Sequence, residues 1–253
     1  MNAAGNRYCV LIPCLNEARA IQGVVSDALL LGMPVIVVDD GSDDQTTSIV
    51  STMDVTLLRH PARRGKGEAL RTGFREAIRH GFDGVLTMDG DGQHHAADIP
   101  AMLEASRLHP GAIVIGARLL AKEQQPPGRR RANAVADWGI SWACGRPIAD
   151  TQSGQRFYPR SALDLVDLPA EHFVFEAAVL ITACRERGIP VVSVPIASRY
   201  EGAFRISHFN PVRDVTRITT YTIGRVFHYG HIVDSYRRSR ATPTIIGNNT
   251  TTH

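Results

Sequence analysis

Short apolar runs alternate with stretches of helical periodicity along most of the chain. The apolar runs predict buried strands at residues 8–12, 35–38, 55–58, 85–88, 112–116 and 191–196. Apolar residues recur at helical spacing over 16–31, 42–53, 68–80, 132–144, 173–187 and 211–236, and we expect Asn16 to cap the first helix and Ser42 or Asp43 the second. Strands that alternate with helices predict an α/β fold with a doubly wound, mostly parallel sheet flanked by helices.

Polar residues follow three of the predicted strands, at the points where the strands end. In doubly wound sheets, ligands bind beyond the carboxyl ends of the strands. The three loops at these ends contain Pro13, Asn16 and Glu17, then Asp39 and Asp40, then Asp89 and Asp91. Because acids scattered at random over a surface would not coincide with three strand ends, the pattern predicts a ligand site at one edge of the sheet.

The segment Asp-Gly-Asp-Gly-Gln at 89–93 is the strongest candidate for metal binding. Two carboxylates two residues apart on a turn can face one hard cation, and oxygen ligands suit Mg²⁺ or Mn²⁺. Gln93 can add a carbonyl oxygen or orient a metal-bound water. A solvated turn is the alternative for an isolated Asp-Gly-Asp, but the preceding strand and the two other acidic loops favour a metal site.

Two further segments have features of nucleotide binding. Asp39 and Asp40 can accept hydrogen bonds from ribose hydroxyls or a base N–H, with a turn followed by a helix cap as the alternative. The loop at 13–17 contains no glycine, which argues against a dinucleotide site after the first strand. Lys66 lies in a glycine-rich segment that lacks P-loop spacing, so both a phosphate contact and a solvated charge remain open for it.

Composition excludes several other classes of protein. The 253 residues are enough for one large α/β domain, and 43% of them are hydrophobic, as in a soluble globular protein. A net charge of +3 is too small to indicate nucleic acid binding. The four cysteines form no Cys-x-x-Cys pair, which favours buried thiols in a reducing cytoplasm. We expect neither a signal peptide nor a membrane-spanning segment.

The second half of the chain contains less regular segments. Residues 119–133 include the basic run 129–131 and are predicted to form a loop that leads into a helix. The predicted helix over 211–236 has apolar and arginine residues, so contact with a membrane surface and packing onto the rest of the chain or onto a second subunit in a homodimer are both open. We expect a main domain at 1–210, a helical extension at 211–240 and a disordered tail at 241–253.

Five motifs occur in a fixed order along the chain. They are Ile-Pro-Cys-Leu-Asn-Glu at 12–17, Val-Val-Asp-Asp-Gly-Ser-Asp-Asp-Gln-Thr at 37–46, Gly-Lys-Gly at 65–67, Met-Asp-Gly-Asp-Gly-Gln-His at 88–94 and Asp-Thr-Gln-Ser-Gly at 150–154. Over about residues 7–215 the chain resembles the family 2 glycosyltransferases of the GT-A fold. Within that family it is similar to the dolichol-phosphate and polyprenyl-phosphate mannosyltransferases.

The resemblance and the residues together imply a role for each candidate. A nucleotide-sugar donor would contact Pro13, Asn16, Glu17, Asp39, Asp40, Lys66, Asp89 and Gly90. The divalent cation, Mg²⁺ or Mn²⁺, would be bound by Asp89, Asp91 and Gln93. Phosphates of the donor or acceptor would meet Arg118, Arg199 and an arginine of the 129–131 run, with Arg129 and Arg131 as candidates.

The implied reaction is inverting transfer of a hexose from a GDP-mannose or UDP-glucose type donor to a lipid or polyprenyl phosphate. Such a phosphate is already anionic, whereas a hydroxyl acceptor needs a general base, for which Asp150 is the candidate. Asp91 would serve catalysis through the metal. The enzyme would be cytoplasmic, and peripheral on the inner face of the membrane if the last helix contacts lipid. Transfer to a non-lipid hydroxyl, a nucleotidyltransferase and a non-catalytic sugar-nucleotide binding module are the alternatives.

Overall fold

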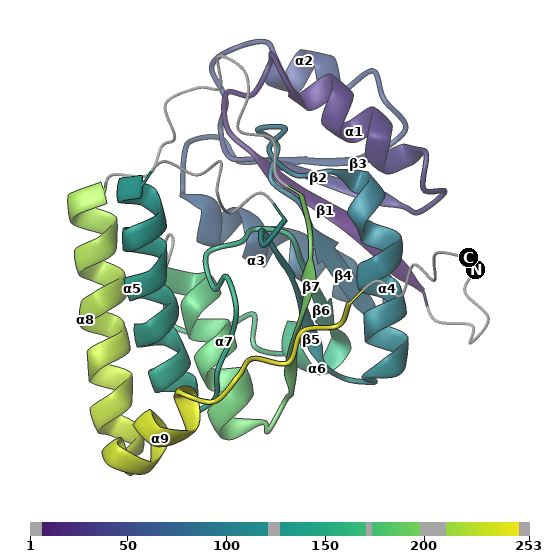
Figure 1. The fold of residues 1–253 in the computed structure, drawn as a ribbon. Helices are drawn as coiled ribbons and strands as arrows, with labels where there is room; N and C mark the ends of the chain where they lie inside the picture. The colour runs from purple at the N-terminus through teal and green to yellow at the C-terminus, as the bar shows by residue number, and fades with distance from the viewer. Residues whose placement is uncertain (1–6, 121–126, 171–173, 198–210, 248–253) are drawn as a thin grey trace.

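The computed structural model describes residues 7–120, 127–170, 174–197 and 211–247, without the side chains at 127–129, 131–132 and 211–215. One seven-stranded sheet lies between two layers of helices (Figure 1). The strands are β1 (Tyr8–Cys14), β2 (Val35–Asp39), β3 (Thr56–Arg59), β4 (Gly84–Thr87), β5 (Ile113–Ala117), β6 (Arg156–Pro159) and β7 (Val191–Pro195). The helices are α1 (Ile21–Leu29), α2 (Thr46–Val50), α3 (Lys66–Arg79), α4 (Ile99–Leu108), α5 (Pro127–Cys144), α6 (Arg160–Leu163), α7 (Val174–Glu186), α8 (Pro211–Tyr229) and α9 (Ile232–Ser239), with a 3-10 turn at Ala96–Asp98.

The sheet has the order β3-β2-β1-β4-β6-β5-β7 and is parallel except at β6. Strand β1 pairs in parallel with β2 and β4, β2 with β3, and β5 with β7. Strand β6 is antiparallel to both of its neighbours, β4 and β5. The carboxyl ends of β1, β2 and β4 therefore share one edge with the amino end of β6. The predicted mostly parallel α/β sheet is confirmed.

Helices cover both faces of the sheet because successive strand side chains point to opposite sides. Val10 and Ile12 of β1 belong to a buried cluster that also contains residues of α1, α2 and α4. Cys9 and Leu11 belong to the opposite cluster, with residues of α3, α5, α7 and α8. Strands buried on both faces read as continuous apolar runs, which is why the sequence predicts them well.

The two predicted helix caps are wrong. Helix α1 begins well after Asn16, and α2 begins after both Ser42 and Asp43, without a side-chain cap bond. Asn16 adopts a positive φ of 56°, and its Oδ1 accepts a hydrogen bond from the N–H of Asp43 at 2.8 Å. Its own N–H donates to Oγ of Ser42, also at 2.8 Å. These polar side chains join two loops at the sheet edge instead of starting helices.

The second half of the chain corrects three further predictions. Helix α5 starts at Pro127, so the run 129–131 lies in a first helical turn rather than in a loop. The helix predicted over 211–236 is divided into α8 and α9 by Gly230 and His231, which both have positive φ. In the predicted tail, the carbonyl of Thr244 accepts a hydrogen bond from the N–H of Ser193 on β7 at 2.9 Å, so this part of the tail is ordered.

Helices α5 and α8 lie side by side, and α9 packs at the C-terminal end of α5 (Figure 1). The indole N–H of Trp142 on α5 donates to the carbonyl of Ile232 on α9 at 3.0 Å. Among the helices that the structure describes, none combines the length and the apolar character needed to cross a membrane.

Candidate active site

Asp89 lies just beyond β4 in a cluster of ion pairs. Lys66, the first residue of α3, places its Nζ 2.8 Å from Oδ1 of Asp89 and 3.3 Å from Oε2 of Glu176 on α7. Burial alone would raise the pKa of Asp89, but Lys66, with smaller effects from His94 and Arg118, outweighs burial and lowers this pKa to about 2. Burial would also lower the pKa of Lys66, yet the two carboxylates raise it above its usual value. Both groups are therefore charged at neutral pH.

The segment 150–154 packs directly against Asp89. A Cβ atom placed on Gly154 would lie 2.2 Å from Oδ2 of Asp89 and 2.7 Å from its Cγ. The hydroxyl of Thr87 on β4 donates to the carbonyl oxygen of Gly154 at 2.8 Å and holds this approach in place. Only glycine leaves room for backbone this close to a side chain. Two motifs more than sixty residues apart in the sequence therefore meet at one carboxylate.

The turn after Asp89 presents further donor atoms. Oδ1 of Asp91 accepts a hydrogen bond from the N–H of Gln93 at 3.0 Å. Both ring nitrogens of His94 are buried without a hydrogen-bond partner in the part of the chain described, and Nδ1 lies 3.9 Å from Oδ2 of Asp89. Burial lowers the pKa of His94 to about 4, so the ring is neutral.

These residues fit a hard divalent cation whose coordination is completed from outside the protein. Within the described ranges, no three His, Cys, Asp or Glu side chains are grouped so that they could hold a metal ion alone. Mg²⁺ is commonly bound by one or two carboxylates together with substrate phosphates and water. An ionised Asp89, the nearby Asp91 and the Gln93 amide match that donor set. The unpartnered ring of His94 shows that polar atoms beside Asp89 are not satisfied by the described part of the protein.

Arg118 and Asp150 form a buried bidentate pair. Nε of Arg118 donates to Oδ2 of Asp150 at 2.7 Å, Nη2 donates to Oδ1 at 2.6 Å, and the Arg118 N–H donates to Oδ2 at 2.8 Å. Burial favours the neutral acid, but these bonds outweigh it and lower the pKa of Asp150. A carboxylate with both oxygens engaged and a lowered pKa is a weak proton acceptor. The geometry therefore favours a positioning role for Asp150.

A second carboxylate lies beside this pair on α5. Oδ1 of Asp137 accepts hydrogen bonds from both the N–H and the hydroxyl of Thr151, each at 2.7 Å. Burial, with a smaller effect from Asp150, raises the pKa of Asp137 to about 6 in spite of these two bonds. The pKa of Asp137 is thus closer to 7 than the pKa of Asp150. Asp137 is therefore better suited to exchange a proton near pH 7.

Arg156 stabilises the loop that carries these residues. Its guanidinium is fully buried and donates to the carbonyl oxygens of Ser153 at 2.8 Å and Thr151 at 2.6 Å. It also donates to the hydroxyl of Tyr158 at 3.2 Å. An arginine that satisfies backbone carbonyls in the interior fixes the path of the chain. The loop therefore reaches Asp89 and Arg118 in a defined conformation.

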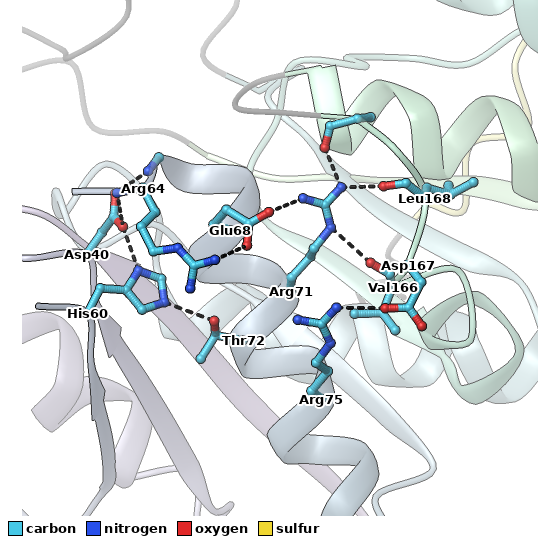
Figure 2. A network of polar contacts seen from close by, with 12 residues as sticks. Asp40, His60, Arg64, Glu68, Arg71, Thr72, Arg75, Val166, Asp167 and Leu168 are labelled. Atoms are coloured by element: carbon cyan, nitrogen blue, oxygen red, sulfur yellow. Dashed lines mark hydrogen bonds and ion pairs between the residues drawn. The ribbon is translucent and has the colours of Figure 1, made fainter. Parts of the chain in front are cut away.

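The carboxylates that end β2 are used for internal hydrogen bonds. Oδ1 of Asp39 accepts the N–H of Ser42 at 2.9 Å and its hydroxyl at 2.5 Å. Oδ1 of Asp40 lies 2.7 Å from Nδ1 of His60 and accepts the N–H of Arg64 at 2.9 Å (Figure 2). The oxygens of both aspartates therefore already hold these loops together.

Helix α3, which begins with Lys66, is anchored from the other side. Arg71 donates from Nε to the carbonyl of Val166 at 3.0 Å and also bonds the carbonyl of Leu168 (Figure 2). Its guanidinium lies 4.5 Å from the ring centroid of Phe175 on α7. These contacts fix the start of α3, and with it Lys66, relative to α7 and Glu176.

The structure brings most of the predicted site residues to one edge. Pro13 lies in β1 opposite Val38 of β2, and the N–H of Glu17 donates to the hydroxyl of Thr46 at 2.7 Å. Gly90 packs on Cys14, where an added Cβ would be 3.0 Å from the Cys14 Cβ. The side chains of Arg129 and Arg131 and the whole of Arg199 lie outside the described residues. Their predicted contacts with phosphate stay predictions.

Sequence reasoning missed three polar residues of this site: Asp137, Arg156 and Glu176. Glu176 stands in an otherwise apolar segment, whereas Arg156 follows the polar residues Ser153 and Gln155. A charged residue inside a predicted buried element indicates a paired or hydrogen-bonded site, because burying an unpaired charge is costly. Asp137 precedes Trp138 in a helix without such a contrast, and nothing in the local pattern distinguishes it.

Comparison with known proteins is consistent with this geometry. The family model described as Glycosyl transferase family 2 matches residues 9–172. An undecaprenyl-phosphate mannosyltransferase of Micrococcus luteus is 30% identical over 75% of this chain and 82% of its own length. A polyprenol monophosphomannose synthase of Mycolicibacterium smegmatis is 28% identical over 75% and 76%. Among solved structures, glucosyl-3-phosphoglycerate synthase from Mycobacterium tuberculosis in complex with Mn²⁺ and UDP-glucose has a TM-score of 0.63 at 22% identity, covering 89% of this chain and 79% of that chain.

Proposed function

Because the chain belongs to glycosyl transferase family 2, we propose that it transfers a hexose from a GDP-mannose or UDP-glucose type donor to a polyprenyl phosphate, with inversion at the anomeric carbon. The family and the named relatives make it a hexosyltransferase of GT-A fold. The relatives named for undecaprenyl phosphate and polyprenol support the lipid acceptor, and the structural neighbour bound to Mn²⁺ and UDP-glucose supports a metal-dependent nucleotide-sugar donor.

On the donor side, Asp89, Asp91 and Gln93 would hold Mg²⁺ or Mn²⁺. The bound cation would neutralise the charge that develops on the leaving diphosphate. Lys66 is a second cation in the same place, with its ammonium 2.8 Å from Asp89. An ammonium held by two carboxylates can turn one of its three donors toward a diphosphate oxygen without losing both ion pairs. Gly154 would keep the Asp89 carboxylate oriented while the donor binds.

Within the candidate site, the observation that carries the acceptor proposal is the bidentate Arg118–Asp150 pair. A hydroxyl acceptor needs a base to remove its proton, whereas a phosphate monoester arrives as an anion. Asp150 is poorly suited to be that base, because Arg118 occupies both of its oxygens and lowers its pKa. In return, Asp150 orients the Arg118 guanidinium, which is a suitable partner for phosphate. This arrangement supports an anionic acceptor.

A hydroxyl acceptor is the second candidate, and Asp137 is the observation in its favour. This carboxylate adjoins Thr151 and has a pKa of about 6, as a general base for neutral pH requires. Replacement Asp137→Asn separates the two cases. The variant would keep its activity with a phosphate acceptor and lose it with a hydroxyl acceptor.

The lipid acceptor agrees with apolar side chains exposed on the last two helices. Ile223 and Phe227 lie one helical turn apart on α8 and are 50% and 67% exposed, and Val233 on α9 is 60% exposed. We propose that they contact a membrane surface. Flotation with anionic phospholipid vesicles tests this, with Phe227→Ser as the weakened variant. A protein that stays off the vesicles but dimerises through these residues would instead identify a subunit interface.

The function is tested by measuring release of nucleoside diphosphate from a panel of sugar nucleotides with Mn²⁺. The informative pair of acceptors is a short-chain polyprenyl phosphate and the alcohol of the same chain. We expect sugar transfer to the phosphate only. Transfer to the alcohol would refute the proposed acceptor, and absence of turnover with every donor would refute the proposed activity in favour of a binding module.

A further inference from the structure

A pocket of about 500 Å³ opens between the C-terminal ends of α5 and α7 and helix α9. Figure 1 shows α9 beside the C-terminal end of α5. Two cysteines, Cys144 and Cys184, line it together with the arginines Arg146, Arg185 and Arg238. None of these residues belongs to the clusters around Asp89 or Asp150. The pocket is therefore distinct from the candidate active site, and the proposed function gives it no role.

The three arginines give the pocket a positive potential. Arg146 donates from Nη1 to the carbonyl of Ile189 at 3.1 Å, and Arg185 donates from Nε to the carbonyl of Ala143 at 2.6 Å. Neither these two nor Arg238 takes part in any ion pair found among the described residues. Burial lowers the pKa of Arg185, and the like charge of Arg238 lowers it further. An anionic molecule is the complementary occupant of such a pocket.

The two thiols differ in acidity. Both are reduced, and they are only 3% and 6% exposed. The Cys144 thiol donates a hydrogen bond to the sulfur of Cys184, and this bond, assisted by Arg146 and Arg185, lowers the pKa of Cys184 in spite of its burial. Burial and the neighbouring Cys184 raise the pKa of Cys144 well above its usual value. Two hydrogen-bonded thiols that line one pocket can act as an attacking and a resolving cysteine.

The other two cysteines are a contrasting pair within the same chain. Cys9 and Cys14 lie in β1 inside the sheet, and neither lines the pocket. Burial raises the pKa of Cys9 to about 12 and raises that of Cys14 as well. A thiol reacts as its thiolate and only where a reagent can reach it. Cys9 and Cys14 therefore serve as unreactive internal controls for the two cysteines of the pocket.

We propose that Cys144 and Cys184 form a thiol-modification site that reacts with small anionic disulfides and closes into an intramolecular disulfide between α5 and α7. The Cys184 thiolate attacks one sulfur of the small disulfide and expels one thiolate. The Cys144 thiol then gives up its proton and attacks the Cys184 sulfur, which expels the second thiolate. Two protein thiols are oxidised by two electrons, one small disulfide is reduced to two thiols, and the released protons end on those thiols.

The site is tested with the reduced full-length protein and glutathione disulfide, a tripeptide disulfide that carries carboxylates. Intact mass spectrometry should show the loss of two hydrogen atoms, and a digest without reductant should contain one cross-linked pair of peptides that joins Cys144 to Cys184. Cys9 and Cys14 should remain free for alkylation after denaturation. Equal oxidation of all four cysteines, or no reaction at the pocket, would overturn the proposal.

Single variants separate the steps and test the role of the pocket. We expect Cys144→Ser to stop at a mixed disulfide on Cys184, and Cys184→Ser to react far more slowly. Arg238→Gln should slow the reaction with glutathione disulfide several-fold but leave the reaction with a neutral disulfide unchanged. The control Arg240→Gln, which lies outside the pocket lining, should change neither reaction. Equal effects of Arg238→Gln on both reagents would refute charge recognition, and accumulation of stable adducts on both cysteines would refute ring closure.

Discussion

Replacement of Gly154 by alanine tests how closely the 150–154 segment must approach the Asp89 carboxylate. The new Cβ would lie 2.2 Å from Oδ2 and 2.7 Å from Cγ of Asp89. An ordinary contact between these atoms requires more than 3 Å, so one group must move by about 1 Å or more. Asp89 cannot move alone, because Oδ1 is held 2.8 Å from Nζ of Lys66.

Two effects of different size should follow. Forcing one extra carbon into a packed interior costs about 1–3 kcal/mol of folding stability. A misplacement of about 1 Å in a catalytic group lowers kcat/KM by roughly 100-fold. Because the displaced group is the predicted metal ligand, the Mn²⁺ concentration that gives half-maximal activity should rise as well.

Kinetics with the best donor, a Mn²⁺ titration and urea denaturation measure these effects on one preparation. Gly23→Ala in α1 is the matched control, because no atom lies within 4 Å of its added Cβ and alanine favours a helix. We expect this control to keep activity and to gain a few tenths of a kcal/mol or more of stability. A Gly154→Ala enzyme with wild-type kcat/KM and an unchanged Mn²⁺ requirement would refute the argument that this approach positions Asp89.

Three further predictions concern charge. Asp150→Asn should lower the free energy of unfolding, measured in urea, by about 3–5 kcal/mol because it leaves Arg118 buried without its partner. The control Asp167→Asn, which breaks an exposed pair with Arg75, should cost less than about 1 kcal/mol. Equal losses in the two variants would contradict a stabilising role for the buried pair. Asp137 has a folded-state pKa of about 6 against an ordinary 3.8, so the folded protein binds this proton more tightly and loses stability as the pH rises from about 4 to about 7. Asp137→Asn lacks that titration, and its stability relative to the native protein should improve by on the order of 1–3 kcal/mol over this pH range; a difference independent of pH would show that the group does not titrate there. Removal of divalent metal with EDTA should abolish turnover until Mn²⁺ or Mg²⁺ is restored, and Asp91→Asn should raise the metal concentration required; full activity in EDTA would exclude the predicted metal dependence.

The sheet could be predicted because each of its apolar strands is marked by the residues of the strand itself and of the loop that follows. Strands buried on both faces, such as β1 and β2, are unbroken apolar runs, and the acids that end them mark the edge at which ligands bind. Strand β6 was not predicted, because its four residues include Arg156 and Pro159 and show no apolar run. Helix α4 was also missed, although its Pro100 stands in the first turn, where proline is favoured.

The candidate site was predictable in its loops but not in its contacts. Asp89 and Gly154 were each assigned to motifs, yet the closeness of the Gly154 backbone to Asp89 depends on β6 pairing with β4. The partnership of Lys66 with Glu176 likewise depends on how α3 packs on α7. Asn16 was misassigned as a helix cap because the same side chain that caps a helix can also bridge two loops. Such choices are decided by tertiary contacts that no local window contains.

The antiparallel strand β6 lies between two parts of the sheet that are built in different ways. The proposed donor side is encoded by one continuous stretch, from β1 to the turn after β4, and its strands are neighbours in both sequence and space. The proposed acceptor side is assembled from β5, α5 and the loop before β6, and this loop brings Gly154 against the Asp89 carboxylate. Exchange of residues 112–170 between relatives should therefore transplant acceptor choice onto an unchanged donor specificity when the contacts that leave this segment are matched as well, which are the pairings of β6 with β4 and of β5 with β7 and the packing of α5 on α7, α8 and α9.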